Sequence, residues 1–76
     1  MNEERIEQYK KIGLNISYYR KLRGMTQLQL AEVVNISRTH LSTIEAPNMQ
    51  TSLSLDLLLD IADALDIPVE SLLHFN

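Results

Sequence analysis

The chain has 76 residues, enough for one small domain, and its 45 % hydrophobic content with a single Phe and no Trp favours a core of Leu, Ile and Val between helices. We therefore expect one all-α domain that spans residues 1–76. Cysteine is absent, and His40 and His74 are too far apart in sequence to form a recognisable ligand pair, so neither a metal nor another cofactor is expected. The net charge of −3 disfavours nonspecific attraction to phosphate.

The ionic residues are unevenly distributed along the chain. All seven Lys and Arg residues lie within residues 1–38, whereas residues 39–76 carry six acids and no Lys or Arg. One end of the molecule can therefore attract a polyanion although the net charge is negative. The first residues are too polar for a signal peptide, and no apolar run approaches the roughly 18 residues of a membrane span, which favours a cytoplasmic protein without membrane contact.

The N-terminal segment is predicted to form one helix that begins after the cap residue Asn2, runs to Arg23 and is stopped by Gly24. Its inward stripe recurs every three or four residues and consists of Ile6, Tyr9, Ile12, Ile16 and Tyr19. Gly13 interrupts this stripe at a cost of about 1 kcal/mol relative to alanine, so we expect it to permit a close helix crossing. Residues 1–9 either extend this helix or form a separate arm.

A second, shorter helix is predicted to begin at Gln27. Thr26 and Gln29 have the three-residue spacing of a capping box, in which each side chain bonds the backbone amide of the other. The inward positions of this helix are spaced three and four residues apart and are Leu30, Ala31 and Val34.

A tight turn and a third helix follow. Asn35 tolerates the left-handed conformation that ends many helices, and Ser37 can cap a new helix that starts at Arg38. At about 100° per residue, the buried side of this helix holds Leu41, Ile44 and Glu45, and the opposite face holds Arg38, Thr39, His40, Ser42 and Thr43. The free face has no carboxylate, and an arginine with several hydroxyls suits the base edges of a DNA major groove. The two helices are therefore predicted to be a DNA-binding helix-turn-helix.

The C-terminal half is predicted to contain a loop and two further helices. Pro47 ends the third helix, and the polar loop after it either contacts the DNA backbone or is a solvated linker. Ser54 caps a fourth helix whose inward residues are Leu55, Leu58, Ile61, Ala62 and Leu65. A short fifth helix spans Val69–Leu73, with Leu72 and Leu73 expected to cover the core.

Across about residues 10–73 the chain carries Ile12-Gly13, Arg20, Gly24-Met25-Thr26-Gln27, Leu30-Ala31, Ile36-Ser37, Leu41, Ile44-Glu45, Leu58, Ile61-Ala62 and Ala64-Leu65. This combined spacing resembles the phage repressor and Cro-type helix-turn-helix family. The resemblance implies a compact five-helix bundle of the lambda-repressor type, whose third helix, about residues 38–45, enters the major groove, usually as a homodimer on a pseudo-palindromic operator. The chain departs from the family at Ala46-Pro47, where a glycine is most common.

The predicted DNA-contacting residues come mainly from the two central helices. The residues expected to read bases are Arg38, Thr39, Ser42 and Thr43. The residues expected to contact the DNA backbone are Gln27, Arg23, His40 and Asn48, and the glutamine that matches Gln27 in the family contacts phosphate and braces the recognition helix.

Arg20 and Glu45 both face inward, where unpaired charges are costly, so we expect them to pair. The matching positions of the family form such a structural ion pair between the first and third helices. The alternative for Arg20 is a contact with DNA phosphate.

Four apolar residues are expected to remain near the surface, namely Leu57, Leu59, Val69 and Phe75. Exposed apolar patches often mark association sites, which predicts a homodimer through the C-terminal helices. The alternative is that these side chains complete the core or cover the N-terminal extension.

The sequence therefore predicts a small transcriptional regulator, a repressor or controller, that binds double-stranded DNA sequence-specifically. The alternative is a protein-interaction module, such as an antitoxin-like partner binder, which the net acidity favours. An enzyme is not expected, because the chain has no glycine-rich phosphate loop or convergent triad and is too small to enclose an ordinary pocket for a substrate or other small molecule.

Overall fold

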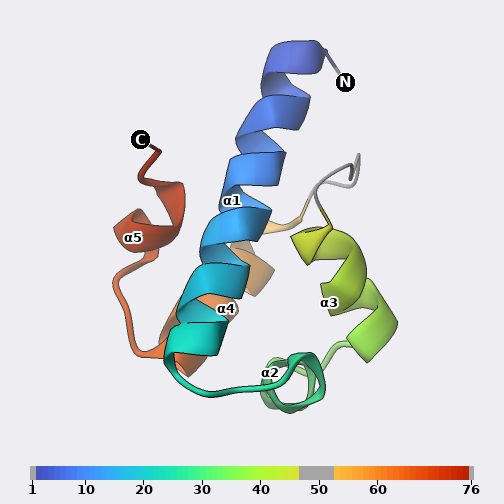
Figure 1. Ribbon diagram of the computed structural model, residues 1–76, viewed down its shortest axis with the longest axis vertical. Helices are drawn as coiled ribbons and strands as arrows, with labels where there is room; N and C mark the ends of the chain where they lie inside the picture. The colour runs from blue at the N-terminus through green and yellow to red at the C-terminus, as the bar shows by residue number, and fades with distance from the viewer. Residues whose placement is uncertain (1, 47–52, 76) are drawn as a thin grey trace.

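The computed structural model describes residues 2–46 and 53–75, and these ranges form five α-helices. The helices are α1 (Glu3–Leu22), α2 (Gln27–Val33), α3 (Arg38–Glu45), α4 (Leu55–Leu65) and α5 (Val69–Leu73). Figure 1 shows α1 as a long central helix with α3 and α5 on its two sides, α2 below it and α4 behind it. This is the all-α five-helix bundle predicted from the sequence.

All five helices contribute to one core. The side chains buried most completely are Ile16 from α1, Leu30 from α2, Leu41 from α3, Ile61 and Leu65 from α4, and Leu72 from α5. Each helix therefore turns an apolar stripe toward the same interior. Because α2 and α3 share this core with α1 and α4, the outer surface that α2 and α3 present is held in a fixed geometry.

Short polar residues start four of the helices. The side chains of Asn2, Thr26, Ser37 and Ser54 each accept a hydrogen bond from the backbone N–H three residues ahead, at 2.8, 3.1, 2.9 and 3.1 Å. Gln29 accepts in turn from the Thr26 N–H at 2.8 Å, which completes the predicted capping box. The cap residues predicted from the sequence therefore set the observed helix starts.

Residues with positive φ follow three of the helices. Gly24 has φ +72°, Asn35 has φ 60° and Asp66 has φ 56°. Asn and Asp enter the left-handed region more readily than other side chains, and Gly does so without steric cost. The end of α3 differs, because Ala46 is extended (φ −70°, ψ 137°), as expected for a residue that precedes proline.

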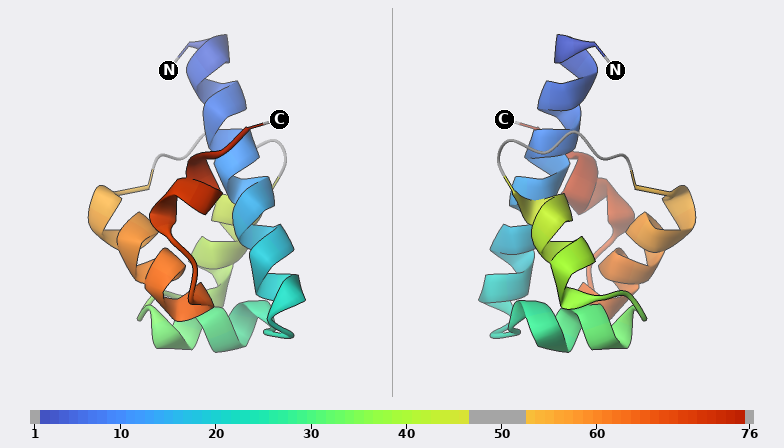
Figure 2. Two further views of the ribbon diagram at one scale, coloured as in Figure 1. Left: turned by 90° about the vertical axis from the view of Figure 1, so that its left-hand side faces the viewer. Right: turned by 90° about the vertical axis from the view of Figure 1, so that its right-hand side faces the viewer.

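The first residues of the chain extend α1 and do not form a separate arm. The helix is continuous from Glu3 and capped by Asn2. Figure 2 shows these N-terminal turns projecting beyond the rest of the bundle. Neither α1 nor any other described helix combines the length and the apolar character needed to cross a membrane.

The crossing of α1 and α3 depends on Gly13. A Cβ added to this residue would collide with the carbonyl oxygen of Ile44 and would lie 3.4 Å from its carbonyl carbon. The glycine predicted to permit a close helix crossing therefore does so, and the neighbour that it admits is the backbone of α3.

Two residues predicted to face the core lie at the surface. Leu55 is 68 % exposed and Leu73 is 44 % exposed. Leu55 belongs to the first turn of α4 and Leu73 ends α5, and both lie at an open groove beside α1. The predictions were wrong because helical periodicity gives the direction of a side chain but not whether a neighbouring helix reaches that turn.

Candidate nucleic-acid interface

The segment between α2 and α3 is a tight turn with the predicted geometry. Asn35 adopts the left-handed conformation, and the N–H of Ile36 donates to the carbonyl of Ala31 at 3.0 Å. Ser37 Oγ then accepts from the His40 N–H at 2.9 Å and starts α3. Ile36 packs against the core, so this turn is anchored from within.

The α3 helix has one buried and one accessible face. Its buried residues are Leu41, Ile44 and Glu45. Its exposed residues are Arg38, Thr39 and His40, and its half-buried residues are Ser42 and Thr43. The five polar candidates thus lie together on the accessible face, and the first turn is the most open to solvent.

The hydroxyl of Thr43 already has a partner within the helix. Thr43 Oγ1 donates to the carbonyl of Thr39 at 2.8 Å. Its oxygen remains able to accept a hydrogen bond, and its methyl group remains available for apolar contact. We therefore expect Thr43 to act toward a ligand as an acceptor or a methyl contact and not as a donor.

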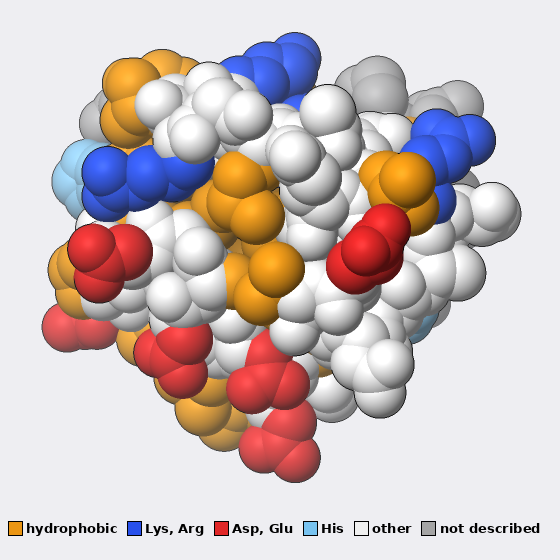
Figure 3. Space-filling view, turned by 90° about the horizontal axis from the view of Figure 1, so that it is seen from below, with side chains coloured by type: hydrophobic (Ala, Val, Ile, Leu, Met, Phe, Trp, Pro, Cys, Tyr) orange, Lys and Arg blue, Asp and Glu red, His pale blue; other side chains and the backbone are white. Residues whose placement is uncertain are grey.

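The charges on the accessible surface favour an anionic ligand at α3. The only acid in α3 is Glu45, which is buried. The first residue of α3 is Arg38, which is exposed. The exposed acids Asp56, Asp60 and Asp63 belong to α4 and not to α3. Figure 3 shows most acidic side chains in the lower half of that view, with one more to the right of its centre, and the lysine and arginine side chains in the upper half.

Arg20 and Glu45 form the ion pair that was expected of them. Arg20 Nε and Nη2 each lie 2.8 Å from a Glu45 carboxylate oxygen, a bidentate arrangement, and Arg20 Nη1 donates to the Met25 carbonyl at 2.8 Å. Only 7 % of Arg20 and 8 % of Glu45 is exposed. Arg20 is thus fully engaged inside the protein, which makes the alternative phosphate contact unsuitable for it.

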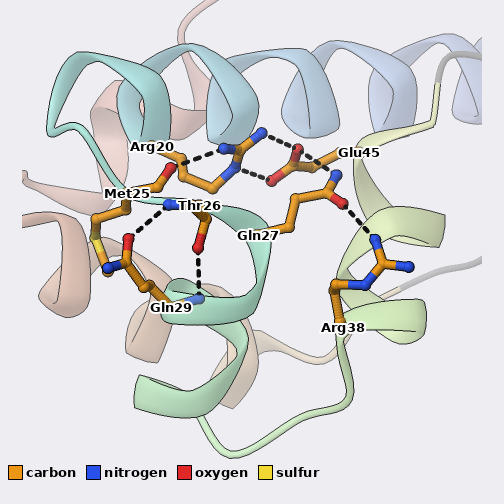
Figure 4. Close-up of polar contacts among 7 residues, drawn as sticks. All are labelled: Arg20, Met25, Thr26, Gln27, Gln29, Arg38 and Glu45. Atoms are coloured by element: carbon orange, nitrogen blue, oxygen red, sulfur yellow. Dashed lines mark hydrogen bonds and ion pairs between the residues drawn. The ribbon is translucent and has the colours of Figure 1, made fainter.

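A line of polar contacts runs from this buried pair to the surface. Gln27 Nε2 donates to Glu45 Oε1 at 3.1 Å, and Arg38 Nη1 approaches Gln27 Oε1 at 3.5 Å. Figure 4 shows this series of side chains extending from α1 through the start of α2 to the start of α3. The side chain of Gln27 is therefore positioned beside Arg38 by a contact with the ion pair.

Arg23 does not lie with the other candidates. Its Nε donates to the carbonyl of Leu65 at 2.8 Å, and its Nη2 donates to the carbonyl of Asp66 at 3.3 Å. These carbonyls lie at the C-terminal end of α4, where intrahelical partners run out. The structure thus gives Arg23 a bracing role between α1 and α4, and the predicted phosphate contact stays a prediction. Asn48 lies outside the described residues.

The predicted dimer surface is mostly part of the core. Leu57, Val69 and Phe75 are partly buried and pack against the core cluster, and the Phe75 ring lies 5.6 Å from Lys11 Nζ. Leu59 is 40 % exposed. The alternative, in which these side chains complete the core, therefore describes three of the four residues.

Asn15 is a polar residue whose role the sequence analysis missed. Its Nδ2 donates to the carbonyl of Leu72 at 2.9 Å and to that of His74 at 3.1 Å. The contact holds the end of α5 against α1. An amide among apolar residues was the available signal, but its partners lie 57 and 59 residues away and could not be identified from spacing.

Known proteins resemble this chain over most of its length. Residues 16–72 match the model of a helix-turn-helix family. The HTH-type transcriptional regulator SinR of Bacillus licheniformis is 38 % identical over 63 residues, which cover 83 % of this chain and 56 % of that protein. The immunity repressor protein of Bacillus phage phi105 is 43 % identical over 61 residues, which cover 80 % of this chain and 41 % of the repressor.

Solved structures share the same arrangement of helices. The crystal structure of SinR, the master regulator for biofilm formation, in complex with DNA has a TM-score of 0.75 at 38 % identity, covering 83 % of this chain and 98 % of that chain. The restriction-modification controller protein C.AhdI from Aeromonas hydrophila has a TM-score of 0.76 at 30 % identity, covering 84 % of this chain and 94 % of that chain.

The chain spans about half the length of the curated relatives that it matches. The match nevertheless includes α2, the turn, α3 and α4, together with the end of α1 and most of α5. The chain belongs to the phage repressor and Cro-type helix-turn-helix family.

Proposed function

We propose that this protein binds double-stranded DNA sequence-specifically and regulates transcription as a repressor or controller. The observation that carries the proposal is the first turn of α3, where Arg38, Thr39 and His40 are exposed while the opposite face of the helix is buried. A guanidinium and hydroxyls on a rigid helix match the donors and acceptors along a major groove. SinR, a relative with the same fold, has been crystallised in complex with DNA.

Within this proposal, the base-reading residues are Arg38, Thr39, Ser42 and Thr43. Arg38 can donate two hydrogen bonds to N7 and O6 of one guanine, and a threonine methyl can contact the methyl of thymine. Gln27 and His40 lie at the starts of α2 and α3 and contact the DNA backbone, where helix N-termini also favour phosphate. These contacts would fix the orientation of α3 in the groove without adding sequence preference.

The family supports a homodimer on a pseudo-palindromic operator as part of this proposal. Such a dimer needs a two-fold contact between copies. Of the four residues first predicted for that contact, Leu59 is the one that is exposed. The proposed regulator would act in the cytoplasm, on the DNA present there.

The function is tested by selecting bound duplexes from a random library and titrating the enriched site at two salt concentrations. We expect a consensus with half-sites about one helical turn apart and binding that weakens as salt rises, because cationic side chains displace counterions from phosphates. Glu70→Gln, a change at an exposed residue of α5, serves as the control that retains the same consensus. A library with no enriched sequence would overturn the proposal.

A further inference from the structure

The outer side of α1 carries an apolar stripe that the other described helices leave uncovered. Leu14, Tyr18 and Leu22 are spaced four residues apart, so they lie along one side of the helix, and they are 54, 60 and 61 % exposed. The Tyr18 ring is held edge-on against the ring of the next residue, at a centroid distance of 5.0 Å. Lys11 and Lys21 are exposed on the same side. We call these five residues the basic face.

The segment of the chain that contains the basic face has no acidic residue to neutralise its lysines. Residues 8–31 contain five Lys and Arg residues and no Asp or Glu. Two of the five, Arg20 and Arg23, are engaged with other parts of the domain. Lys11 lies over the Phe75 ring, 5.6 Å from its centroid, and among the described residues neither Lys11 nor Lys21 forms an ion pair. Both can therefore interact with the carboxylates of a partner.

A groove of the opposite character lies between the end of α2 and α4. Its volume is about 460 Å³, and its lining consists of Val33, Val34, Asn35, Asp60, Asp63 and Ala64. Val33 is 63 % exposed, so it offers apolar surface to a partner beside the two aspartates. Within the described part of the chain, neither Asp60 nor Asp63 takes part in an ion pair. We call this site the acidic groove.

We propose that the basic face of one copy of this chain docks into the acidic groove of a second copy. The stripe of the basic face supplies apolar side chains for the exposed Val33, and its lysines supply counter-charges for Asp60 and Asp63. A rigid tyrosine at the centre is a typical anchor of protein interfaces. The two surfaces are therefore complementary both in charge and in apolar character.

The same charges favour a head-to-tail contact between the two copies over a two-fold contact. A two-fold contact through the basic face would bring its lysines toward the same lysines of the other copy, and a two-fold contact through the acidic groove would bring Asp60 and Asp63 toward the same aspartates. Like charges at close range repel, whereas a head-to-tail contact pairs each surface with its opposite.

The arrangement of the helices permits this head-to-tail contact. Figure 2 shows α1 and α4 on opposite sides of α3. In Figure 3 most acidic side chains lie in the lower half of the view and the lysine and arginine side chains lie in its upper half. Each copy can thus present both surfaces at once and leave α3 uncovered. The contact does not depend on the proposed DNA binding.

The contact is tested by charge reversal in the full chain without DNA, with sedimentation velocity as the measurement. We expect the wild-type sedimentation coefficient to rise with concentration at low salt and to fall as salt screens the charges. Lys11→Glu/Lys21→Glu and Asp60→Lys/Asp63→Lys should each lose this association when alone. An equimolar mixture of the two double variants should associate, and the quadruple variant should regain self-association.

Glu70→Lys is the matched control, because it reverses an exposed acid on α5, outside both surfaces, and should leave the association unchanged. Circular dichroism establishes that each variant keeps the helical content of the wild type. Wild-type sedimentation that is independent of concentration would overturn the proposal. Association retained by both double variants, or a mixture of folded double variants that does not associate, would overturn it as well.

Discussion

Glu45 connects the stability of the domain to the geometry of its candidate interface. Its carboxylate accepts two hydrogen bonds from Arg20 and one from Gln27, and the side chain is almost fully buried. In such surroundings an ion pair contributes rigidity and orientation more reliably than net stability. The position of Gln27, and through it the surroundings of Arg38, should therefore change when Glu45 is altered.

We predict that Glu45→Ala lowers the free energy of unfolding by about 3 to 5 kcal/mol, because it leaves the Arg20 guanidinium buried without its counter-charge. The double variant Arg20→Met/Glu45→Leu should recover most of this loss, since neither charge then remains. Urea unfolding monitored by circular dichroism measures both changes. A loss below about 1 kcal/mol for the single variant, the range of exposed ion pairs, would contradict the structural role assigned to this pair.

Arg38 should behave differently, because it is exposed and its hydrogen bond to Gln27 is long at 3.5 Å. We predict that Arg38→Ala weakens binding to the selected site by about 1 to 3 kcal/mol and relaxes the preference at one base pair. The free energy of unfolding should change by less than about 0.5 kcal/mol.

Titration of the selected duplex and of its single-base variants tests the role of Arg38. Arg5→Ala removes the same charge from an exposed position in the first turns of α1 and serves as the control, with base preferences unchanged. An equal loss on every duplex would assign Arg38 to a phosphate instead of a base.

At the scale of the helices, the closest constraint is the crossing of α1 and α3 at Gly13. We predict that Gly13→Ala destabilises the domain by about 1 to 3 kcal/mol, because the added methyl forces the two backbones apart. Alanine would otherwise stabilise a helix by about 1 kcal/mol relative to glycine, so the sign of the change identifies the cause. Thermal unfolding measures it, with Ser17→Ala on the same helix as the control. A stabilised Gly13→Ala variant would show that α3 can move away without cost.

Local chemistry explains why the helix starts and the recognition helix were predicted well. Caps such as Ser37 and turn residues such as Asn35 act within a few positions of the sequence, so their effect can be deduced without the fold. The assignments that failed depend on contacts between distant segments. Phe75 packs against the core because α5 returns to α1, and Leu55 stays exposed because no other described helix covers the first turn of α4.

The interface was also only partly predictable. The residues of α3 were placed correctly on the accessible face, since helical periodicity is sufficient to separate the two sides of a short helix. A contact with the DNA backbone was predicted for Arg23 from its positive charge alone, because the sequence does not show which groups surround it in the fold. Only the fold reveals that the carbonyls at the end of α4 lie within its reach.

For the whole molecule, the separation of charge along the chain becomes a separation in space. The basic first half supplies α1 and the start of α3, and the acidic second half supplies α4. This arrangement keeps the acids of α4 off α3, whose first residue, Arg38, carries the positive charge of the proposed DNA contact despite a net charge of −3. It also gives the two outer sides of the molecule opposite signs, which is the basis of the proposed head-to-tail contact.

The two proposed contacts between copies predict different arrangements of half-sites on DNA. A two-fold homodimer requires inverted half-sites, whereas a head-to-tail contact joins copies that face the same way and therefore requires direct half-sites. We predict that two direct half-sites, spaced by about one helical turn, are bound more tightly than two independent ones. Lys11→Glu/Lys21→Glu should abolish this gain and leave the gain on inverted half-sites intact.

Titration of duplexes with single, direct and inverted half-sites measures both gains as ratios to the single site. The ratio removes the general loss of affinity that follows from reversing two positive charges, because that loss affects every duplex alike. A direct pair bound no better than two independent half-sites would mean that the head-to-tail contact does not operate on DNA. A gain on direct half-sites that survives the charge reversal would place the contact between neighbouring copies on another surface.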